Sequence, residues 1–177
     1  GRAVFHLLRP RPDFRSAPRL RAHQENWKKP AARRASMLAP SRFCFLNNEY
    51  QISIRDDWNT PSLSKLWLYN LHYFDDLNAE GAGERVEWHR LLIRRWITEN
   101  PPGIGIGWEP YPISLRAVNW VKYFSYKGSP KIEWLISLNL QAEVLFKKIE
   151  YHILANHILA NAKALIFLGT YFKGARA

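Results

Sequence analysis

The segment Glu150–Asn161 (EYHILANHILAN) carries the side chains best suited to acid–base chemistry in this sequence. His152 and Asn156 are four residues apart, and so are His157 and Asn161. An Asn amide can donate a hydrogen bond to an anion, and a His can transfer a proton near neutral pH. We therefore select Asn156 and His157 as candidate catalytic residues and His152 as a candidate substrate-binding residue.

Structural roles are the alternative for the same three residues. Asn156 falls where one predicted helix ends and the next begins, which suits an N-cap. His157 could instead bond a helix terminus, and a His such as His152 is favoured near a helix C-terminus. Because the two His are five residues apart and no third ligand is close, we expect neither a metal site nor another cofactor.

The loop Asn100–Pro112 (NPPGIGIGWEPYP) is a second candidate, because it presents Trp108, Glu109 and Tyr111. Its glycines follow a G-x-G-x-G spacing after a helix rather than a strand, so we reject a nucleotide site. Two aromatic residues and a carboxylate suit a sugar, since rings stack on its C–H faces and the carboxylate accepts its hydroxyl groups. The alternative is a structural loop with a buried Trp.

Two polar residues, Arg116 and Asn119, fall on the first turns of the helix that follows this loop. The Arg116 guanidinium could bind a uronate carboxylate through two parallel hydrogen bonds. It could equally form an ion pair with Glu109. We include Arg116 and Asn119 among the candidate substrate-binding residues.

Hydrophobic periodicity predicts a mainly α-helical chain. Short connections should arrange the helices as antiparallel hairpins, and Ser62 could cap the first of them. Two short strands around Asn47-Asn48 should form a β-hairpin near residues 43–54. The expected helices cover about residues 63–78, 84–99, 113–124, 135–149 and 157–172.

The last predicted helix is apolar on nearly all sides, so protein should surround it. It ends only five residues before Ala177. We therefore expect further helices beyond Ala177 that cover its outer face.

The net charge of +11 is concentrated at the N-terminus. Residues 1–45 hold eleven Lys/Arg and two Asp/Glu, or +9, which leaves +2 for residues 46–177. The Pro/Arg-rich segment 1–42 could bind a polyanion or be a solvated leader. We expect no nucleic-acid partner, because base-stacking aromatics are not interleaved with these charges.

Cys44 is the only cysteine in the sequence, so no disulfide can form within the chain. No apolar run is long enough to span a membrane.

Three stretches together resemble the heparinase II/III-like polysaccharide lyases: LWLYNLHYFDDL, NPPGIGIGWEPYPISLRAVNW and YHILANHILANAKAL. The resemblance covers about residues 43–177. It implies that this region is the N-terminal part of an (α/α) toroid, whose remainder and following β-sandwich domain would be absent from the sequence. It also implies β-elimination of a uronate-containing acidic polysaccharide, and a location in the cell envelope, in the periplasm or outside the cell; the residues themselves leave a cytoplasmic location open.

The same resemblance assigns roles at the site. Asn156 matches the residue that neutralises the uronate carboxylate, and His157 matches the His beside it. A catalytic Tyr would follow beyond Ala177, so the 177-residue chain alone should be inactive. The rival hypotheses are a non-catalytic glycan-binding or surface-polysaccharide assembly protein of the same fold, and a nucleic-acid or anionic-surface binder acting through residues 1–45.

Overall fold

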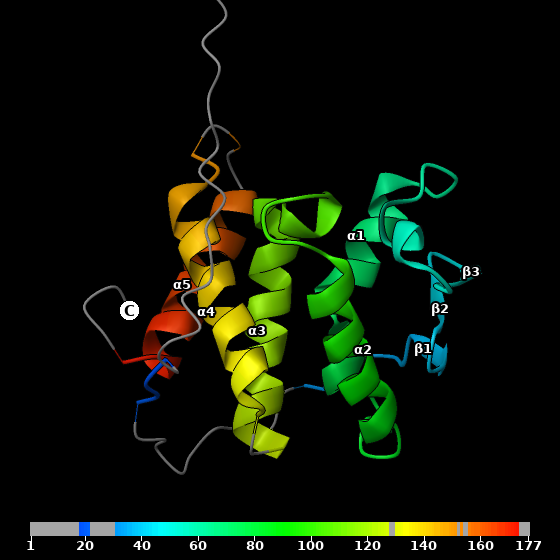
Figure 1. Ribbon diagram of the computed structural model, residues 1–177, viewed down its shortest axis with the longest axis horizontal. Helices are drawn as coiled ribbons and strands as arrows, with labels where there is room; N and C mark the ends of the chain where they lie inside the picture. Colours follow the sequence, from blue (N-terminus) through cyan, green and yellow to red (C-terminus); the bar gives the residue numbers. More distant parts are fainter. Residues whose placement is uncertain (1–17, 22–30, 128–129, 152, 154–155, 174–177) are drawn as a thin grey trace, which may run out of the picture.

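The computed structural model describes residues 18–21, 31–127, 130–151, 153 and 156–173. Within them the chain forms five α-helices and one three-stranded antiparallel sheet, which lies on the opposite side of the molecule from the last helix (Figure 1). The strands are β1 (Met37–Ala39), β2 (Arg42–Phe45) and β3 (Asn48–Gln51). The helices are α1 (Lys65–Tyr73), α2 (Val86–Glu99), α3 (Pro110–Lys127), α4 (Ile132–Lys147) and α5 (Asn156–Tyr171), with short 3-10 turns η1 (Arg55–Asn59), η2 (Asp75–Asn78) and η3 (Ile106–Trp108).

The predicted β-hairpin is confirmed, although its turn lies one residue earlier than expected. Leu46 and Asn47 form the turn, with positive φ angles of 53° and 58°. Two consecutive residues with positive φ match the right-handed twist of the strands that they join. Asn48, expected in the turn, instead pairs with Phe45 in the ladder between β2 and β3.

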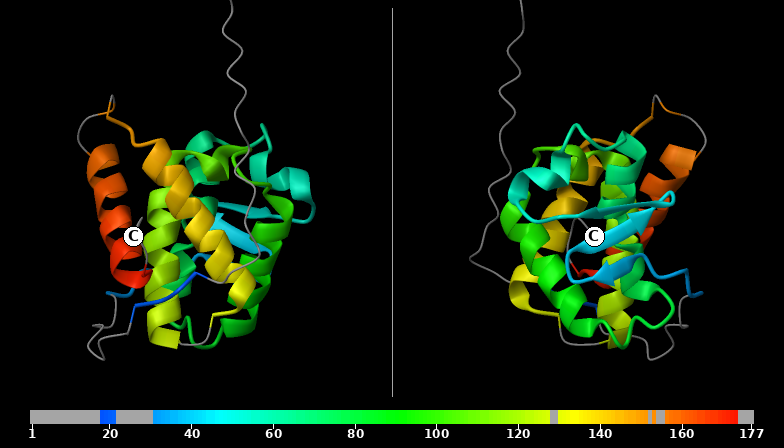
Figure 2. Two further views of the ribbon diagram at one scale, coloured as in Figure 1. Left: turned by 60° about the vertical axis from the view of Figure 1, so that its left-hand side comes forward. Right: turned by 90° about the vertical axis from the view of Figure 1, so that its right-hand side faces the viewer.

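A third strand, β1, was not predicted, and it begins at Met37 within the segment that the sequence assigns to a basic arm. The sheet packs against α1, in front of the helices in the right-hand view of Figure 2. The Phe45 ring meets Trp67 edge-on at 5.1 Å, and Trp67 Nε1 donates to the carbonyl oxygen of Asn48 at 2.9 Å. The sheet and the first helix therefore share one apolar core.

The buried carboxylate of Asp76 joins the sheet to α2. His89 Nε2 lies 2.8 Å from Asp76 Oδ2, and Arg85 Nε donates to the same oxygen at 2.9 Å. The backbone N–H groups of Ser36 and Met37 donate to Asp76 Oδ1 at 2.7 and 3.0 Å. Burial alone would raise the pKa of Asp76, but these hydrogen bonds hold it well below its usual range.

Four of the five predicted helices are found with bounds that differ by a few residues. The first, expected over about residues 63–78, ends as α1 at Tyr73, because Phe74 is left-handed (φ 61°) and the 3-10 turn η2 follows. The central helix is α3, in contact with α1, α4 and α5. The amphipathic spacing buries an aromatic cluster in which the Trp96 ring lies 5.4 Å from Trp108 and 5.8 Å from Trp120. Ser64, rather than the predicted Ser62, caps α1, because its hydroxyl accepts a hydrogen bond from the Trp67 backbone N–H at 3.2 Å.

The prediction of an incomplete (α/α) toroid is wrong. A toroid needs many hairpins in two concentric layers around a central opening. The described residues form five helices and a small sheet around one aromatic core, too few for such a ring. The hydrophobic period of each helix shows which face is buried, but it does not determine how successive hairpins curve relative to one another.

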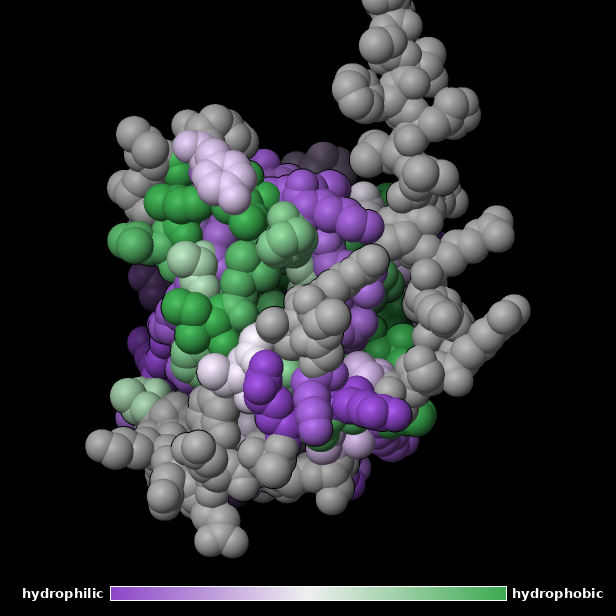
Figure 3. Space-filling view, turned by 90° about the vertical axis from the view of Figure 1, so that its left-hand side faces the viewer, coloured by the Kyte–Doolittle hydropathy of each residue, from purple (hydrophilic) through white to green (hydrophobic). Residues whose placement is uncertain are grey.

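The outer side of α5 is uncovered in the described part of the chain. Leu159 is 69% exposed and Ile166 is 65% exposed, and Phe146 at the end of α4 is 69% exposed. Figure 3 shows hydrophobic side chains gathered on this face of the molecule.

None of the helices in the described ranges is both long and apolar enough to cross a membrane.

Candidate functional site

A cluster of polar and aromatic side chains gathers where the first turns of α3 and α5 meet α1. The Tyr111 ring stacks on the His157 ring, with centroids 4.3 Å apart and an interplanar angle of 29°. The Tyr69 ring lies 6.4 Å from Tyr111 on an adjoining helix. Two predicted site residues that are 46 positions apart in the sequence thus meet face to face.

The His157 ring is held by a chain of hydrogen bonds that reaches into the core. Its Nδ1 lies 3.2 Å from Glu150 Oε2, and the same oxygen accepts a hydrogen bond from Asn161 Nδ2 at 3.3 Å. Asn161 also donates to Ser114 Oγ at 3.0 Å and accepts from the Glu150 backbone N–H at 2.9 Å. With its proton on Nδ1, a neutral His157 keeps a lone pair on Nε2 for a general base.

Glu109 lies at the surface beside this cluster. The Tyr69 hydroxyl donates a hydrogen bond to Glu109 Oε2, and Lys65 Nζ lies 2.9 Å from the same oxygen. Burial, and then the hydrogen bond to Glu109, raise the pKa of the Tyr69 hydroxyl well above its usual value. Tyr69 is therefore neutral at physiological pH and acts as a hydrogen-bond donor.

Trp108, in contrast, is a core residue, the alternative that the sequence left open. It is 3% exposed, packs on Trp96 and donates from Nε1 to the carbonyl oxygen of Asn100 at 3.2 Å. Its ring is thus used to fix the glycine loop against α2, away from the Tyr111–His157 pair. A sugar cannot reach a ring that is buried to this extent.

Arg116 is fully buried and also makes internal contacts. Its guanidinium donates to Gln141 Oε1 at 2.8 Å, to the Gly107 carbonyl at 2.8 Å and to the His72 carbonyl at 3.2 Å. It also stacks over the Trp96 ring at 3.8 Å. Burial lowers the pKa of Arg116. These contacts join four segments of the chain, and they replace both the ion pair with Glu109 and the uronate contact that the sequence suggested.

The remaining predicted residues are divided between structural and exposed positions. Asn119 Nδ2 donates to the Tyr73 carbonyl at 2.9 Å and to Asp75 Oδ1 at 2.7 Å, so it secures the end of α1. Asn156 is exposed at the first residue of α5. His152 lies outside the described residues.

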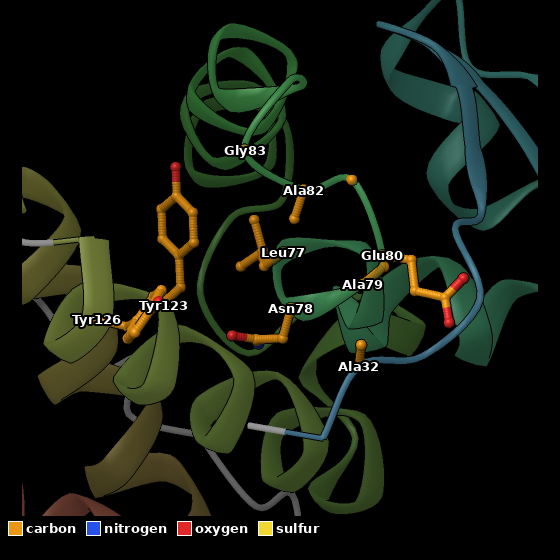
Figure 4. Close-up of a pocket in the computed structure, with 10 residues that line it drawn as sticks. Ala32, Leu77, Asn78, Ala79, Glu80, Ala82, Gly83, Tyr123 and Tyr126 are labelled. Atoms are coloured by element: carbon orange, nitrogen blue, oxygen red, sulfur yellow. The ribbon is translucent and has the colours of Figure 1, made fainter. Parts of the chain in front are cut away.

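The larger of two notable cavities, about 380 Å³, lies near the opposite end of α3 from Tyr111. Figure 4 shows Tyr123 and Leu77 on facing sides of it, with the Glu80 carboxylate directed away. Its lining is mostly apolar and holds no predicted site residue. Among the described residues, no three His, Cys, Asp or Glu side chains gather in a way that could hold a metal ion.

Four members of the cluster were not selected from the sequence: Tyr69, Ser114, Glu150 and Asn161. Tyr69 and Tyr73 are four residues apart on α1, a spacing that could have indicated an aromatic face. Glu150 precedes His157 by seven residues across a helix break, so only the folded chain brings the two together.

Comparison of the chain with family models, curated proteins and solved structures finds no match. A functional conclusion therefore depends on the geometry and on the sequence resemblance.

Proposed function

We propose that this chain contributes part of the active site of a lyase that cleaves uronate-containing acidic polysaccharide by β-elimination, as its resemblance to heparinase II/III-like polysaccharide lyases suggests. The observation that carries the proposal is the arrangement of His157: stacked on Tyr111, bonded to Glu150 and next to the exposed Asn156. A positioned His beside an exposed amide donor is what removal of a proton next to a carboxylate requires. On the same resemblance, we place the protein in the cell envelope, in the periplasm or outside the cell.

In the proposed reaction, the Asn156 amide donates a hydrogen bond to the uronate carboxylate and stabilises the charge that develops when C5 loses its proton. His157 Nε2 accepts that proton. The C5–H electron pair forms a C4=C5 double bond, and the C4–O bond breaks. The departing oxygen takes a proton from an acid, a role that the resemblance assigns to a Tyr. The products are an unsaturated uronate end and a free hydroxyl end.

The test incubates the protein with a panel of uronate polysaccharides. The unsaturated product absorbs in the ultraviolet, so its formation can be followed directly. Asn156→Ala should lower kcat by roughly 10²- to 10³-fold, the usual effect of removing one donor to a developing anion. Asn139→Ala, which replaces a helical Asn on α4, is the matched control and should retain turnover. Equal turnover in Asn156→Ala and in the unchanged protein would refute the assignment.

Glycan binding without cleavage is the second candidate. The partly exposed Glu109 and Tyr111 lie beside His157, and a carboxylate next to aromatic rings suits a site that binds sugar without cleaving it. Calorimetric binding of an acidic glycan that never yields an unsaturated end would favour this second candidate.

A further inference from the structure

The groove between α3 and α5 gathers basic side chains from three separate parts of the chain. The two helices lie side by side (Figures 1 and 2), and the small cavity of about 50 Å³ along them is lined by Arg33, Lys122 and Lys163. Arg33 precedes the sheet, and its backbone carbonyl accepts a hydrogen bond from the Glu80 N–H at 2.8 Å. A fixed backbone thus brings the first of these cations to the groove.

The positive charges in this groove outnumber the negative ones. Asp75 is the acidic residue in the lining, and both of its oxygens are engaged, with Arg33 Nη1 at 2.6 Å and Asn119 Nδ2 at 2.7 Å. Three cations and one carboxylate leave a net charge of +2. Lys122 lies 5.8 Å from the Phe167 ring centroid, and within the described ranges neither it nor Lys163 forms a salt bridge.

The lysine on α3 is the one most affected by this crowding. Burial, and then the positive charges of Lys163 and Arg33, lower the pKa of Lys122, while Asp75 acts in the opposite direction. Like charges held together disfavour the charged form, and a bound anion would restore it. The groove therefore has the electrostatics of an anion site.

The size of the groove restricts the anion that fits. One water needs roughly 10–15 Å³ of cavity space, so the cavity of about 50 Å³ has room for about three to five waters. That space suits a sulfate or carboxylate group and is too small for a whole sugar ring. Apolar side chains such as Leu115 and Val118, together with Asn and Ser residues, complete the lining. Ser114 already donates to the Pro110 carbonyl at 2.9 Å, which leaves the cations as the main contacts for an anion.

The groove adjoins the His157 cluster. Ser114 lines the groove and accepts the hydrogen bond from Asn161 that supports Glu150 and His157. Lys163 follows Asn156 by seven residues on α5, two helical turns or about 10 Å along the axis, and therefore on the same face of the helix. A ligand bound at Asn156 could extend along α5 to Lys163.

We propose that Arg33, Lys122 and Lys163 form a second anion subsite, which holds a sulfate or carboxylate group of the same acidic glycan whose uronate binds at Asn156. The identity of the glycan rests on the proposed function, whereas the binding of an oxyanion does not. The subsite would select glycans that carry a second negative charge roughly 10 Å from the reacting uronate.

The first experiment titrates the 177-residue chain with inorganic sulfate and follows the backbone amide signals by NMR. Signals of α3 and α5 around the groove should shift, and Lys122→Gln/Lys163→Gln should weaken binding about 5- to 30-fold, the effect of losing two modest charge pairs. Lys147→Gln/Lys148→Gln removes the same charge from the exposed end of α4 and should leave the affinity unchanged. Equal affinity in the two double variants would refute the subsite. Their circular dichroism spectra should match that of the unchanged protein.

The second experiment compares sulfated and desulfated uronate oligosaccharides. A preference for the sulfated form that disappears in Lys122→Gln/Lys163→Gln assigns the subsite to sulfate, and an equal loss for both forms assigns it to carboxylate. If sulfate binding depends on the two lysines but binding of neither oligosaccharide does, the glycan part of the inference is refuted. If Asn156→Ala leaves elimination unchanged while the lysine effects persist, the proposed function fails and the oxyanion site stands.

Discussion

Replacing Arg116 with Met should destabilise the fold strongly, whether or not the protein binds a ligand. The change removes three hydrogen bonds and leaves Gln141 Oε1 and the carbonyl oxygens of His72 and Gly107 without their donor. An orphaned buried acceptor costs about 1–3 kcal/mol, or roughly 3–9 kcal/mol for three. Relief from the desolvation of a buried cation offsets several kcal/mol of this. The expected net loss is about 3–5 kcal/mol, the usual range when one partner of a buried charged contact is removed.

The assay is thermal and urea unfolding of the 177-residue chain followed by circular dichroism. For a chain of this size, a loss of about 3–5 kcal/mol lowers Tm by roughly 6–20 °C. Arg94→Met, at an exposed position on α2, is the matched control and should change stability by less than about 0.5 kcal/mol. If Arg116→Met melts with the unchanged protein but loses affinity for a uronate glycan, Arg116 contacts ligand and the structural interpretation is incorrect.

Three further predictions concern the elements that support the site. In Gly107→Ala the new Cβ would lie 2.6 Å from His72 Nδ1, so the free energy of unfolding measured with urea should fall by about 1–3 kcal/mol. Gly103→Ala, whose Cβ would have nothing within 4 Å, is the control. It should lose only the penalty for a left-handed backbone, about 1–2 kcal/mol. Burial, and then the charge of Arg116, lower the pKa of His72 to about 3. Folding thus favours the neutral form of His72, whose contribution to the free energy of unfolding should be fully present above about pH 6.5. Below that pH, the free energy of unfolding should fall by up to about 1.4 kcal/mol per pH unit. Equal urea midpoints at pH 7.5 and pH 5 would contradict this. Ser64→Ala should lower the free energy of unfolding by about 1 kcal/mol and Ser62→Ala by much less, and the reverse order would show that Ser62 is the cap.

The elements were predictable from the sequence because each depends on local periodicity. Residues such as Ile113, Ala117 and Trp120 recur at steps of four and three, and all three are fully buried in α3. β1 could not be found in this way, because three residues in a Pro/Arg-rich segment carry no period, and its place is set by backbone hydrogen bonds to Asp76. The mutual arrangement of the hairpins depends on packing between helices, so the toroid prediction had no local signal to correct it.

The site was predictable in part, and the reason lies in burial. Sequence reasoning placed Tyr111 and His157 in one site, and their rings are stacked. It assigned Arg116 to a ligand because the residue follows the glycine loop closely and a guanidinium can bind a carboxylate through two parallel hydrogen bonds. Here three neutral oxygens and an aromatic face surround the guanidinium, an arrangement that involves α1, α2 and α4 and that no spacing in the sequence shows.

The stretch from which a lyase was predicted has two structural roles, and these roles determine which experiments are informative. In the stretch NPPGIGIGWEPYPISLRAVNW, Trp108 and Arg116 hold the glycine loop to the core, whereas Tyr111 reaches the His157 cluster. The core half of the motif would be needed for folding in a lyase and in a protein that only binds glycan. Loss of activity on changing Trp108 or Arg116 would therefore not distinguish the two functions. Asn156 is exposed and lies outside the buried core of the described residues, so the chemistry is best tested there.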